Sequence, residues 1–515
     1  MNPCINCNII DKLYRPTWTC GRYDAATQSA IMYNLIAGFS FFFENKSAEI
    51  VGTLLTFSRG DSFTLDDLVE TLEITKETLS PFIDELLNLG LLSDKPINDK
   101  VVTNYRKQLS TLNNNIEGIK ENTNGLSIPV SDAEKAYINR AHKRIGIVMM
   151  ELTYNCSEMC IHCYNPGATR NNREENHRND RASLSLEQYK KIIDELYDEG
   201  TFMVCLTGGD PFSNPYAWDI IEYLYEKGIA FEIFTNGQKL IGQEERLASY
   251  FPGYVAVSIY SPVEEVHDSI TRIKGSLKRS LTVIEKLHEL HVPLILKCVI
   301  MQNNVNTYHG VLQIAQKLQA EVQFDCRLFD SVDGDTCVSH YLRLTPQQLQ
   351  IAFRDRNSMY YVGKEVKGFG ALPHDINEPA CLTGTSSICI TPEGFIIPCV
   401  CLHIILGDTK KQSVREIMTD NKTLSHITSL KISEYEECGQ HEYCSFCILC
   451  PGLNYSEHGT MRKAAENNCY YAKVRFDLYH NLILGKDPLK GRTIEQALSD
   501  IDVAPPKHLK RLYSK

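Results

Sequence analysis

The chain has 515 residues, too many for one ordinary domain, and 43% of them are hydrophobic, enough to fill well-packed cores. Its net charge of −11 argues against a surface for nucleic-acid phosphates, which depends on clustered Lys and Arg. It has no apolar run of about 18 residues and no signal-peptide pattern at its start. We therefore expect a cytoplasmic protein of two to four domains that binds neither nucleic acid nor membrane.

Residues 1–100 predict a small α+β domain. The segments SAIMYNL and GFSFFFEN are typical of two strands joined by a tight turn, and KSAEIVGTLLTF of an amphipathic helix. Thr64 and Asp67 form a capping-box-like start for a second helix, and Thr75 begins a third that ends at Gly90. With a closing strand at GLL, this order predicts a winged helix. Eight Lys/Arg against fourteen Asp/Glu in this region argue against DNA binding.

A polar linker, expected to be partly helical, covers residues 101–140, and residues 141–335 then repeat a strand–helix unit. The predicted strands are IGIVMMELT, TFMVCLTGGD, AFEIFTNG, YVAVSIYS, VPLILKCVI and EVQFDCRLF. Near-continuous apolar strands separated by amphipathic helices, here including 238–250 and 277–290, indicate a parallel sheet. Six units are fewer than the eight of a closed barrel, so the expected α/β fold is an open, partial (β/α)6 barrel. Chemistry in such folds sits at the carboxyl ends of the strands.

Nineteen cysteines are many for this chain, and clustered cysteines in a reducing compartment point to metal or redox work. Three of them, Cys156, Cys160 and Cys163, follow the first barrel strand directly, where an active site is expected. Nine more lie within residues 380–470, a loop-rich region that we expect to be organised by metal. Four single cysteines between the groups are expected to be ordinary buried thiols: Cys205, Cys298, Cys326 and Cys337.

The triplet C-x3-C-x2-C at the end of a first barrel strand resembles the signature of the radical S-adenosylmethionine (SAM) superfamily. Three thiolates without a local fourth can hold three irons of a [4Fe–4S] cluster and leave one iron open. The resemblance implies that SAM binds the open iron and is cleaved by an electron from the reduced cluster. The resulting 5′-deoxyadenosyl radical would then abstract a hydrogen atom from substrate. It also implies an electron donor such as flavodoxin or ferredoxin.

Further residues at strand ends resemble SAM-contacting positions of this superfamily. The segment TGGDP, residues 207–211, resembles a Gly-Gly-Glu motif whose backbone meets the SAM amino group, with Asp in place of the commoner Glu. Its glycines let backbone approach a ligand closely. Residues of TNG and of SIYS resemble positions that touch ribose and methionine, although ordinary turn chemistry explains them as well. Two residues beside the third cysteine resemble positions near adenine. The candidate SAM contacts are Gly208, Gly209, Asp210, Asn236, Ser258 (with Ser261 beside it), His162 and Tyr164.

Residues 380–470 resemble the SPASM extension, which holds auxiliary iron–sulfur clusters beside radical SAM barrels. CLTGTSSICITPEGFIIPC matches its first part, whereas C-x5-C-x2-C-x2-C departs from the commoner C-x2-C-x5-C-x3-C order. Which cysteine serves which cluster therefore stays open, as do the choice between Cys389 and Cys401 and an open iron for a substrate thiolate. A structural zinc domain is the alternative. Leaving Cys401 aside gives eight candidate ligands for two clusters: Cys381, Cys389, Cys399, Cys438, Cys444, Cys447, Cys450 and Cys469.

The N-terminal domain resembles the peptide-chaperone protein of pyrroloquinoline quinone biosynthesis, a fold that recurs as a precursor-recognition element in maturases of ribosomal peptides. Such domains bind an extended leader as an added strand, for which GFSFFFEN is the expected edge, although its Phe residues also suit a core. The resemblance implies an enzyme that forms a thioether or carbon–carbon crosslink in a ribosomal precursor peptide. One alternative is formylglycine formation on a protein partner, as in anaerobic sulfatase maturases. Another is an iron–sulfur or zinc-bearing winged-helix regulator.

The remaining segments carry less information. Residues 336–379 are expected to connect the barrel to the cysteine-rich region, and residues 471–515 to be helical with a basic end, KHLKRLYSK. No catalytic acid or base stands out. Three aspartates near the last strand end look like solvated loop carboxylates: Asp325, Asp330 and Asp333.

Overall fold

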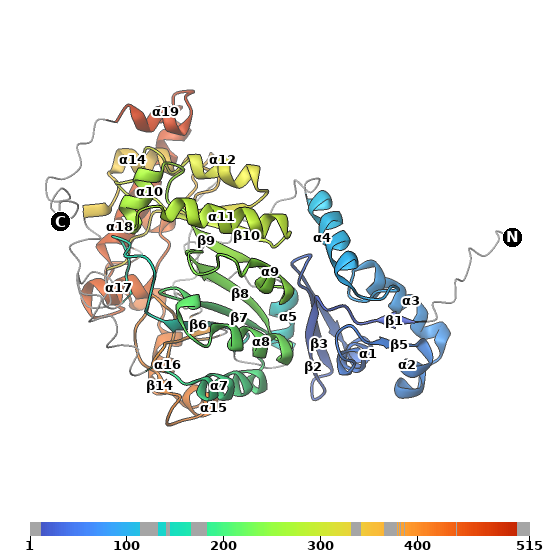
Figure 1. Ribbon diagram of the computed structural model, residues 1–515. Helices are drawn as coiled ribbons and strands as arrows, with labels where there is room; N and C mark the ends of the chain where they lie inside the picture. Colours follow the sequence, from blue (N-terminus) through green and yellow to red (C-terminus); the bar gives the residue numbers. More distant parts are fainter. Residues whose placement is uncertain are drawn as a thin grey trace.

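The computed structural model describes residues 12–113, 132–140, 145–165, 183–330, 341–364, 379, 381, 383–385, 387–438 and 440–501. Figure 1 shows an N-terminal domain beside a central barrel, with the C-terminal helices on the barrel's other side. Several features predicted above lie outside the described residues: the middle of the linker, Asp333, Cys337 and the basic end KHLKRLYSK. Within the described ranges, no helix is both long and apolar enough to span a membrane.

The N-terminal domain contains a three-stranded antiparallel sheet and three helices. The sheet has the order β2-β3-β4, so that β4 is an edge strand, and α1 packs against it. The strands are β1 (Leu13–Tyr14), β2 (Thr19–Asp24), β3 (Ser29–Asn34), β4 (Phe39–Glu44) and β5 (Ser62–Phe63), and the helices are α1 (Asn45–Thr56), α2 (Leu65–Leu72) and α3 (Lys76–Asn88). The predicted capping box is present, since Asp67 N donates to Thr64 Oγ1 at 3.2 Å and Thr64 N to the Asp67 carboxylate at 2.7 Å.

The closing strand predicted at residues 90–92 is wrong. These residues instead complete the end of α3, because the backbone N–H groups of Leu91 and Leu92 both donate to Leu86 O, at 2.9 and 3.2 Å. Gly90 makes this possible with a φ of +65°, the left-handed conformation typical of a helix end. Only Ser93 pairs with a strand, in a single bridge to Tyr14. Strand β2, in contrast, was not anticipated.

The six predicted barrel strands are confirmed as one parallel series. They are β6 (Ile147–Thr153), β7 (Met203–Gly208), β8 (Ala230–Thr235), β9 (Val255–Ser258), β10 (Leu294–Val299) and β11 (Glu321–Asp325), and each pairs in parallel with the next. The helices that cover them are α7 (Leu186–Glu199), α8 (Ala217–Lys227), α9 (Glu244–Ser249), α10 (Glu264–Thr271), α11 (Ser276–Glu289) and α12 (Gly310–Lys317). The helix predicted over 238–250 is only α9, because Gly242 turns the chain with a φ of +78°. Helix α10 was not anticipated.

The cysteine-rich region extends the barrel sheet. Strand β12 (Ser387–Ile390) pairs in parallel with β6, and the hairpin continues through β13 (Phe395–Ile397) to β14 (Gly407–Asp408). The barrel sheet therefore has nine strands, in the order β11-β10-β9-β8-β7-β6-β12-β13-β14. This pairing fixes the cysteine-rich region to the strand that leads into the cysteine triplet.

Helices close the C-terminal side of the barrel. They are α14 (Pro346–Ala352), α15 (Val414–Met418), α16 (Lys422–Ser429), α17 (Pro451–His458), α18 (Glu466–Ile483) and α19 (Ile494–Ser499), with the short 3-10 helices η2 (Ile432–Glu434) and η3 (Glu442–Phe446). A further 3-10 helix, η1 (Pro211–Ser213), follows β7 within the barrel. Helix α18 is joined to the end of β11, where the Tyr471 hydroxyl donates to Cys326 O at 2.6 Å. The cysteine-rich region predicted over residues 380–470 therefore contains β12 to β14 as well as the loops and short helices that lead to α18.

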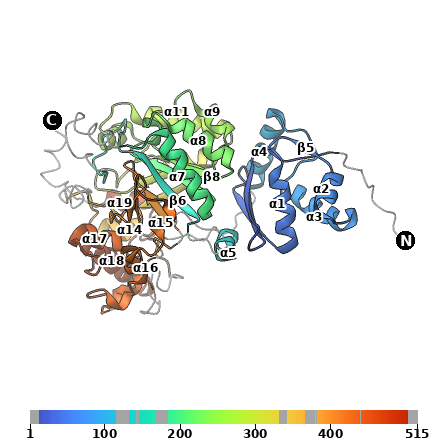
Figure 2. The same cartoon turned by 90° about the horizontal axis from the view of Figure 1, so that it is seen from below.

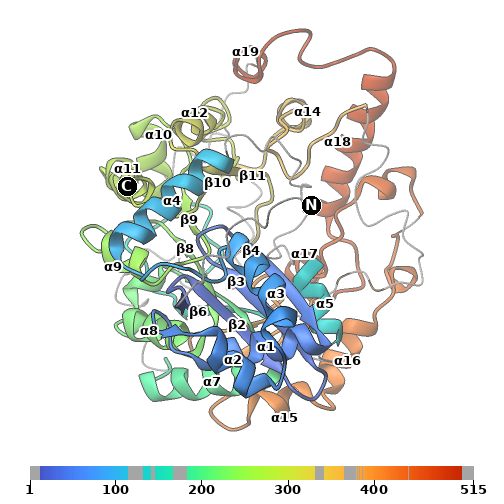
Figure 3. The same cartoon turned by 90° about the vertical axis from the view of Figure 1, so that its right-hand side faces the viewer.

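The N-terminal sheet packs against the amino end of the barrel, and Figures 2 and 3 show the two parts from two further directions. Its contribution to the shared apolar cluster is Trp18, Cys20, Ile31, Tyr33 and Leu35. The barrel contributes Ile147, Phe202, Met203 and Ala230, which lie at or next to the first residues of β6, β7 and β8. Two linker helices, α4 (Asp99–Asn113) and α5 (Asp132–Arg140), join the contact, and the Tyr33 hydroxyl donates to Glu134 of α5 at 2.7 Å. The domain therefore lies at the opposite end of the strands from the cysteine triplet.

Candidate active site

The cysteine triplet lies in the loop that leaves the carboxyl end of β6. This loop is fixed against α10, because Met159 N donates to Thr271 O at 3.0 Å and Ile161 N to Ile270 O at 2.9 Å. Ile161 also packs into a small apolar cluster with Ile270 and Tyr260. The hydrogen bonds and the buried side chain set the path of the loop, and the triplet projects from it at the edge where a parallel barrel places its chemistry.

The triplet gathers negative charge if its thiols ionise. Burial raises the pKa of Cys163 to about 11, and burial together with the Glu158 carboxylate raises that of Cys160. Burial also raises the pKa of Glu158 to about 8, although it accepts a hydrogen bond from the Cys160 thiol at 3.5 Å. Three crowded thiols among carboxylates can all ionise only beside a positive group. The donor set therefore suits an iron–sulfur cluster, which is held by thiolates.

Gly208 and Gly209 bring two loops together at the ends of β6 and β7. Gly209 N donates to Thr153 O at 2.6 Å, and Asp210 N to Asn155 O at 2.9 Å. A Cβ at Gly208 would lie 2.3 Å from Thr153 O, and one at Gly209 would lie 2.4 Å from Asn155 O. Glycine is needed here for contact with the cysteine loop itself, a reason that differs from the close approach to a ligand expected from the sequence.

Asp210 is fully buried and joins β7 to β8. Its carboxylate accepts hydrogen bonds from the Thr235 hydroxyl at 2.6 Å, from Asn236 N at 3.0 Å and from Phe212 N at 3.0 Å. Asn236 then donates from its side-chain amide to the sulfur of Cys156 at 3.2 Å. The Gly-Gly-Asp segment, the TNG segment and the first cysteine therefore form one connected hydrogen-bond network at neighbouring strand ends.

The two serines differ in what surrounds them. Ser258 ends β9 and lies in register with Lys297 of β10. Ser261 is buried, accepts from Val263 N at 3.0 Å and is hydrogen-bonded to the Thr307 hydroxyl at 2.9 Å. These contacts match the turn interpretation of Ser261.

His162 and Tyr164 lie half-buried beside Cys163. The His162 ring stands edge-on to Tyr260 with centroids 4.8 Å apart, and burial lowers the pKa of His162 to about 4. The Tyr164 ring stands edge-on to Phe329 with centroids 6.3 Å apart. The Tyr260 hydroxyl lies 4.0 Å from the sulfur of Cys160, so Tyr260 is a site residue that sequence reasoning missed. Its position directly after the strand end YVAVS was the available signal.

The aspartates near the end of β11 are not solvated. The Asp325 carboxylate accepts from Arg327 N at 2.8 Å and pairs with the Arg327 guanidinium at 3.3 Å. Arg327 itself is buried with 5% of its surface exposed, and Asp330 with 7%. The expectation of loop carboxylates in water is therefore wrong for these two residues. The buried ion pair places a fixed cation near the carboxyl end of the barrel.

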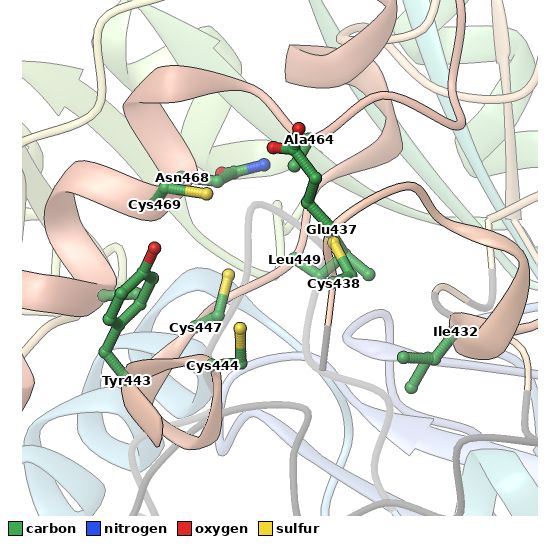
Figure 4. A pocket seen from close by; sticks show the side chains of 11 residues that line it. Ile432, Glu437, Cys438, Tyr443, Cys444, Cys447, Leu449, Ala464, Asn468 and Cys469 are labelled. Carbon is green, nitrogen blue, oxygen red and sulfur yellow. The ribbon is translucent and has the colours of Figure 1, made fainter. Parts of the chain in front are cut away.

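Four cysteines of the C-terminal region line one pocket. Figure 4 shows their sulfur atoms directed toward a common space, which Tyr443 and Glu437 also border. The four are Cys438, Cys444, Cys447 and Cys469, from the loop before η3, from η3 and the segment after it, and from α18. Among the residues that the structure describes, no three His, Cys, Asp or Glu side chains converge as for a single metal ion. A four-iron cluster needs more widely spaced sulfurs, because each thiolate binds a different iron.

The other cysteines of this region lie elsewhere. Cys389 is in the middle of β12, fully buried, and packs with Ile397 and Val400. Cys399 and Cys401 follow β13, and Cys450 caps the start of α17. The single cysteines Cys205, Cys298 and Cys326 are buried, as the sequence predicted.

Comparison with known families agrees with both cysteine regions. Residues 150–313 match the model of the radical SAM superfamily, and residues 381–451 match that of the SPASM iron–sulfur cluster-binding domain. Each match begins at or next to a cysteine group, and the SPASM match ends before α18, which carries Cys469.

Three known proteins illustrate the similarity. The AdoMet-dependent heme synthase of Methanosarcina barkeri is 24% identical over 348 residues, 61% of this chain and 93% of that protein. The antilisterial bacteriocin subtilosin biosynthesis protein AlbA of Bacillus subtilis is 27% identical over 342 residues, 63% of this chain and 70% of that protein. The crystal structure of Streptococcus suis SuiB bound to precursor peptide SuiA is similar in fold, with a TM-score of 0.53 at 13% identity, covering 89% of this chain and 99% of that one.

Proposed function

Because the chain is a radical SAM enzyme with an iron–sulfur SPASM domain, we propose that it modifies a ribosomally synthesised precursor peptide. The observation that carries this proposal is the N-terminal domain, which presents β4 as an edge strand next to the barrel. AlbA, similar over 63% of this chain, takes part in the biosynthesis of a bacteriocin. The similarity in fold to SuiB covers 89% of this chain, so it includes at least part of the N-terminal domain.

The enzyme uses a [4Fe–4S] cluster and SAM, which together supply a 5′-deoxyadenosyl radical when bound. We assign the cluster to Cys156, Cys160 and Cys163. Asp210 and Asn236 hold Cys156 in place through the hydrogen bonds described above. We assign the SAM contacts to the same edge of the barrel, at Gly208, Gly209, Asp210, Asn236, Ser258, His162 and Tyr164. Two auxiliary clusters in the C-terminal region carry electrons, and a donor such as flavodoxin or ferredoxin reduces the enzyme.

The leader of the peptide would bind as a fourth strand next to β4. In the described part of the chain β4 pairs only with β3, and α5 packs against these two strands, so that the other edge of β4 has no partner strand. Phe41 and Phe43 pack into the domain core and Phe42 into the contact with the barrel, whereas Phe39 is 51% exposed. The apolar side chains of β4 therefore mostly stabilise the domain, and its backbone edge with Phe39 remains for recognition.

The charge of the N-terminal domain indicates what kind of leader fits. Helix α3, next to β4 through the edge-on pair of Phe43 and Phe82, carries exposed acidic side chains. They are Glu77, Asp84 and Glu85. A leader that carries Lys would be attracted to this surface, and the attraction would weaken as salt is added.

The reaction we propose is formation of a thioether or carbon–carbon crosslink in the core of the precursor. The test is to co-express the enzyme with the short open reading frame next to its gene and to weigh the peptide. A product lighter by two hydrogen atoms supports a crosslink, and the Cys160→Ala variant should leave the peptide unchanged. A peptide of unchanged mass with the active enzyme would contradict the proposal.

A second variant tests the leader site separately. Phe39→Ser should weaken leader binding and reduce the modified fraction at limiting enzyme. The control is Ile241→Ser, since Ile241 is also exposed, at 45%, but lies on the barrel after β8. Equal modification of the peptide by both variants would contradict the proposal that the leader binds at β4. Formylglycine in a protein partner, with no change in the peptide, would favour the sulfatase-maturase alternative.

A further inference from the structure

The cysteines of the C-terminal region fall into two groups. One group lines the pocket of Figure 4 and consists of Cys438, Cys444, Cys447 and Cys469. The remaining cysteines do not line that pocket. The C-x2-C pair of Cys447 and Cys450 is thus split, because Cys447 lines the pocket whereas Cys450 is the residue directly before α17, which begins at Pro451.

A tight turn holds Cys399 and Cys401 together. Leu402 N donates to Cys399 O at 3.0 Å, so that Cys401 lies inside a turn closed by its two neighbours. The Thr383 hydroxyl donates to Pro398 O at 2.9 Å, which holds the residue two positions after Cys381 against the residue before Cys399. Cys381, Cys399 and Cys401 therefore lie on chain segments that are fixed to one another.

Cys401 is held next to Cys450 by the backbone. A Cβ placed on Gly452 would lie 2.3 Å from Cys401 O and 2.8 Å from the Cys401 Cβ, so the first turn of α17 touches Cys401 directly. Cys450 directly precedes this turn, as the N-cap residue of α17. The buried guanidinium of Arg327 interacts with both Cys401 and Cys450. Cys401 therefore shares its surroundings with Cys399 and Cys450.

Cys389 is in a different environment. It is a central residue of β12, with no exposed surface, and its strand neighbours are Met149 of β6 and Ile397 of β13. A residue paired on both sides within a sheet cannot move toward a loop without breaking the ladder. Its contact with Cys401 is through the apolar cluster that Ile397 and Val400 share.

We propose that Cys401 is the fourth protein ligand of an auxiliary [4Fe–4S] cluster bound by Cys381, Cys399 and Cys450, and that Cys389 is not a ligand. Each auxiliary cluster then has four cysteines, and neither keeps an open iron. The clusters serve electron transfer and do not anchor a substrate thiolate. This inference concerns the cofactor alone and does not depend on which peptide the enzyme modifies.

The test uses the full-length enzyme, reconstituted without oxygen, in a background in which Cys156, Cys160 and Cys163 are all replaced by Ala. This parent should bind about eight irons, from two four-iron clusters. Cys401→Ala should lose about one to four of them, because the cluster becomes a three-iron form or is lost. Cys389→Ala should keep them all. Cys399→Ala is the positive control, because it removes another proposed ligand of the same cluster and shows how much iron such a loss costs.

Spectra provide the second measurement. Cys401→Ser keeps the size of the side chain and offers oxygen in place of sulfur, so it should change the Mössbauer and EPR spectra of one cluster while circular dichroism stays as in the parent. Cys389→Ser should leave both spectra unchanged. Parent-like spectra and iron content in the Cys401 variants, or loss of iron in Cys389→Ala with unaltered circular dichroism, would overturn the assignment.

Discussion

The carboxylate of Asp210 connects the ends of two barrel strands beside the cysteine triplet. It accepts hydrogen bonds from the Thr235 hydroxyl and the Asn236 N–H, and Asn236 donates to the sulfur of Cys156. Asp210 is itself fully buried, so a lost hydrogen bond here is not replaced by water. One side chain thus sets, through Asn236, the position of Cys156, the ligand that we propose for the cluster.

We expect Asp210→Asn to destabilise the protein by about 1–3 kcal/mol, because an amide N–H would face the N–H of Asn236 or the hydroxyl of Thr235. Thermal unfolding of the anaerobic protein measures the change. Thr235→Val, which removes one donor and leaves the carboxylate two others, should cost less. Equal unfolding temperatures for Asp210→Asn and the parent would show that this network does not support the site.

Glu232 is a buried carboxyl away from the cysteine triplet. Burial raises the pKa of Glu232 to about 8, from an ordinary value of 4.5, and outweighs a hydrogen bond from Tyr254. Between these two pH values the folded protein keeps a proton that the unfolded chain releases. The free energy of unfolding should therefore fall as pH rises from 4.5 toward 8, by about 1.4 kcal/mol per pH unit at most.

The variant Glu232→Gln should lack this dependence, because its amide does not titrate. Unfolding temperatures of the variant and the parent at pH 6 and pH 8 would separate the effect, with the parent losing more between the two. Glu226→Gln, an exposed change on α8, is the matched control and should follow the parent. A parent whose stability is the same at both pH values would contradict this prediction.

Residues of the candidate site that belong to a sequence motif could be predicted. Residues that are distant in sequence and are brought to the site only by the fold could not. The cysteine triplet, Gly208, Gly209 and Asp210 have fixed spacings at strand ends, which sequence reasoning can find. Tyr260 approaches Cys160 across 100 residues, and Arg327 approaches Cys401 across 74 positions in the numbering. Such contacts depend on loop paths set by packing, for which no local pattern exists.

At the scale of elements, β12 joins the cysteine-rich region to the barrel. Its parallel pairing with β6 was not predicted. The strand has only four residues, SICI, and lies among cysteines that are candidate metal ligands, so its sequence is equally typical of a metal-binding loop. The six strands of the barrel were predictable from their length and continuous apolar character. The false strand after α3 arose because Leu91 and Leu92 are apolar for a different reason: both are buried against the domain's helices.

We expect Ile390→Ala to weaken the barrel and the cysteine-rich region together. Ile390 is fully buried in β12 and pairs with Met150 of β6, so the cavity should cost about 2–5 kcal/mol. Calorimetry of the anaerobic protein should show a single transition for both regions at a lower temperature. Two separate unfolding transitions, one at a lower temperature and one at the unfolding temperature of the parent, would show that the two regions unfold independently.

At the scale of the whole molecule, the N-terminal sheet and the cysteine triplet are separated by the length of the barrel strands. The N-terminal sheet packs on Ile147, Met203 and Ala230 at the strand starts, and the cysteine triplet follows the end of β6. A strand such as β7, of six residues, spans about 20 Å. A peptide bound at β4 must therefore extend along the barrel to reach the radical.

This arrangement predicts a minimum spacing between leader and modified residue. A precursor with fewer than about six extended residues between them should still bind but should not be modified, because an extended chain covers about 3.3 Å per residue. Fluorescence anisotropy of labelled peptides would measure binding, and mass spectrometry would measure modification. Efficient modification of precursors with a shorter spacer would contradict a leader site at the amino end of the barrel.

The most direct test of the central claim measures 5′-deoxyadenosine and modified peptide together in the fully reconstituted enzyme with dithionite. With the intact precursor, we predict both products, and a strong decrease of both when the leader is removed. Equal modification of the leaderless peptide would contradict a recognition role for the N-terminal domain. Failure to cleave SAM with any precursor, although all three clusters are present, would contradict the proposed function as a whole.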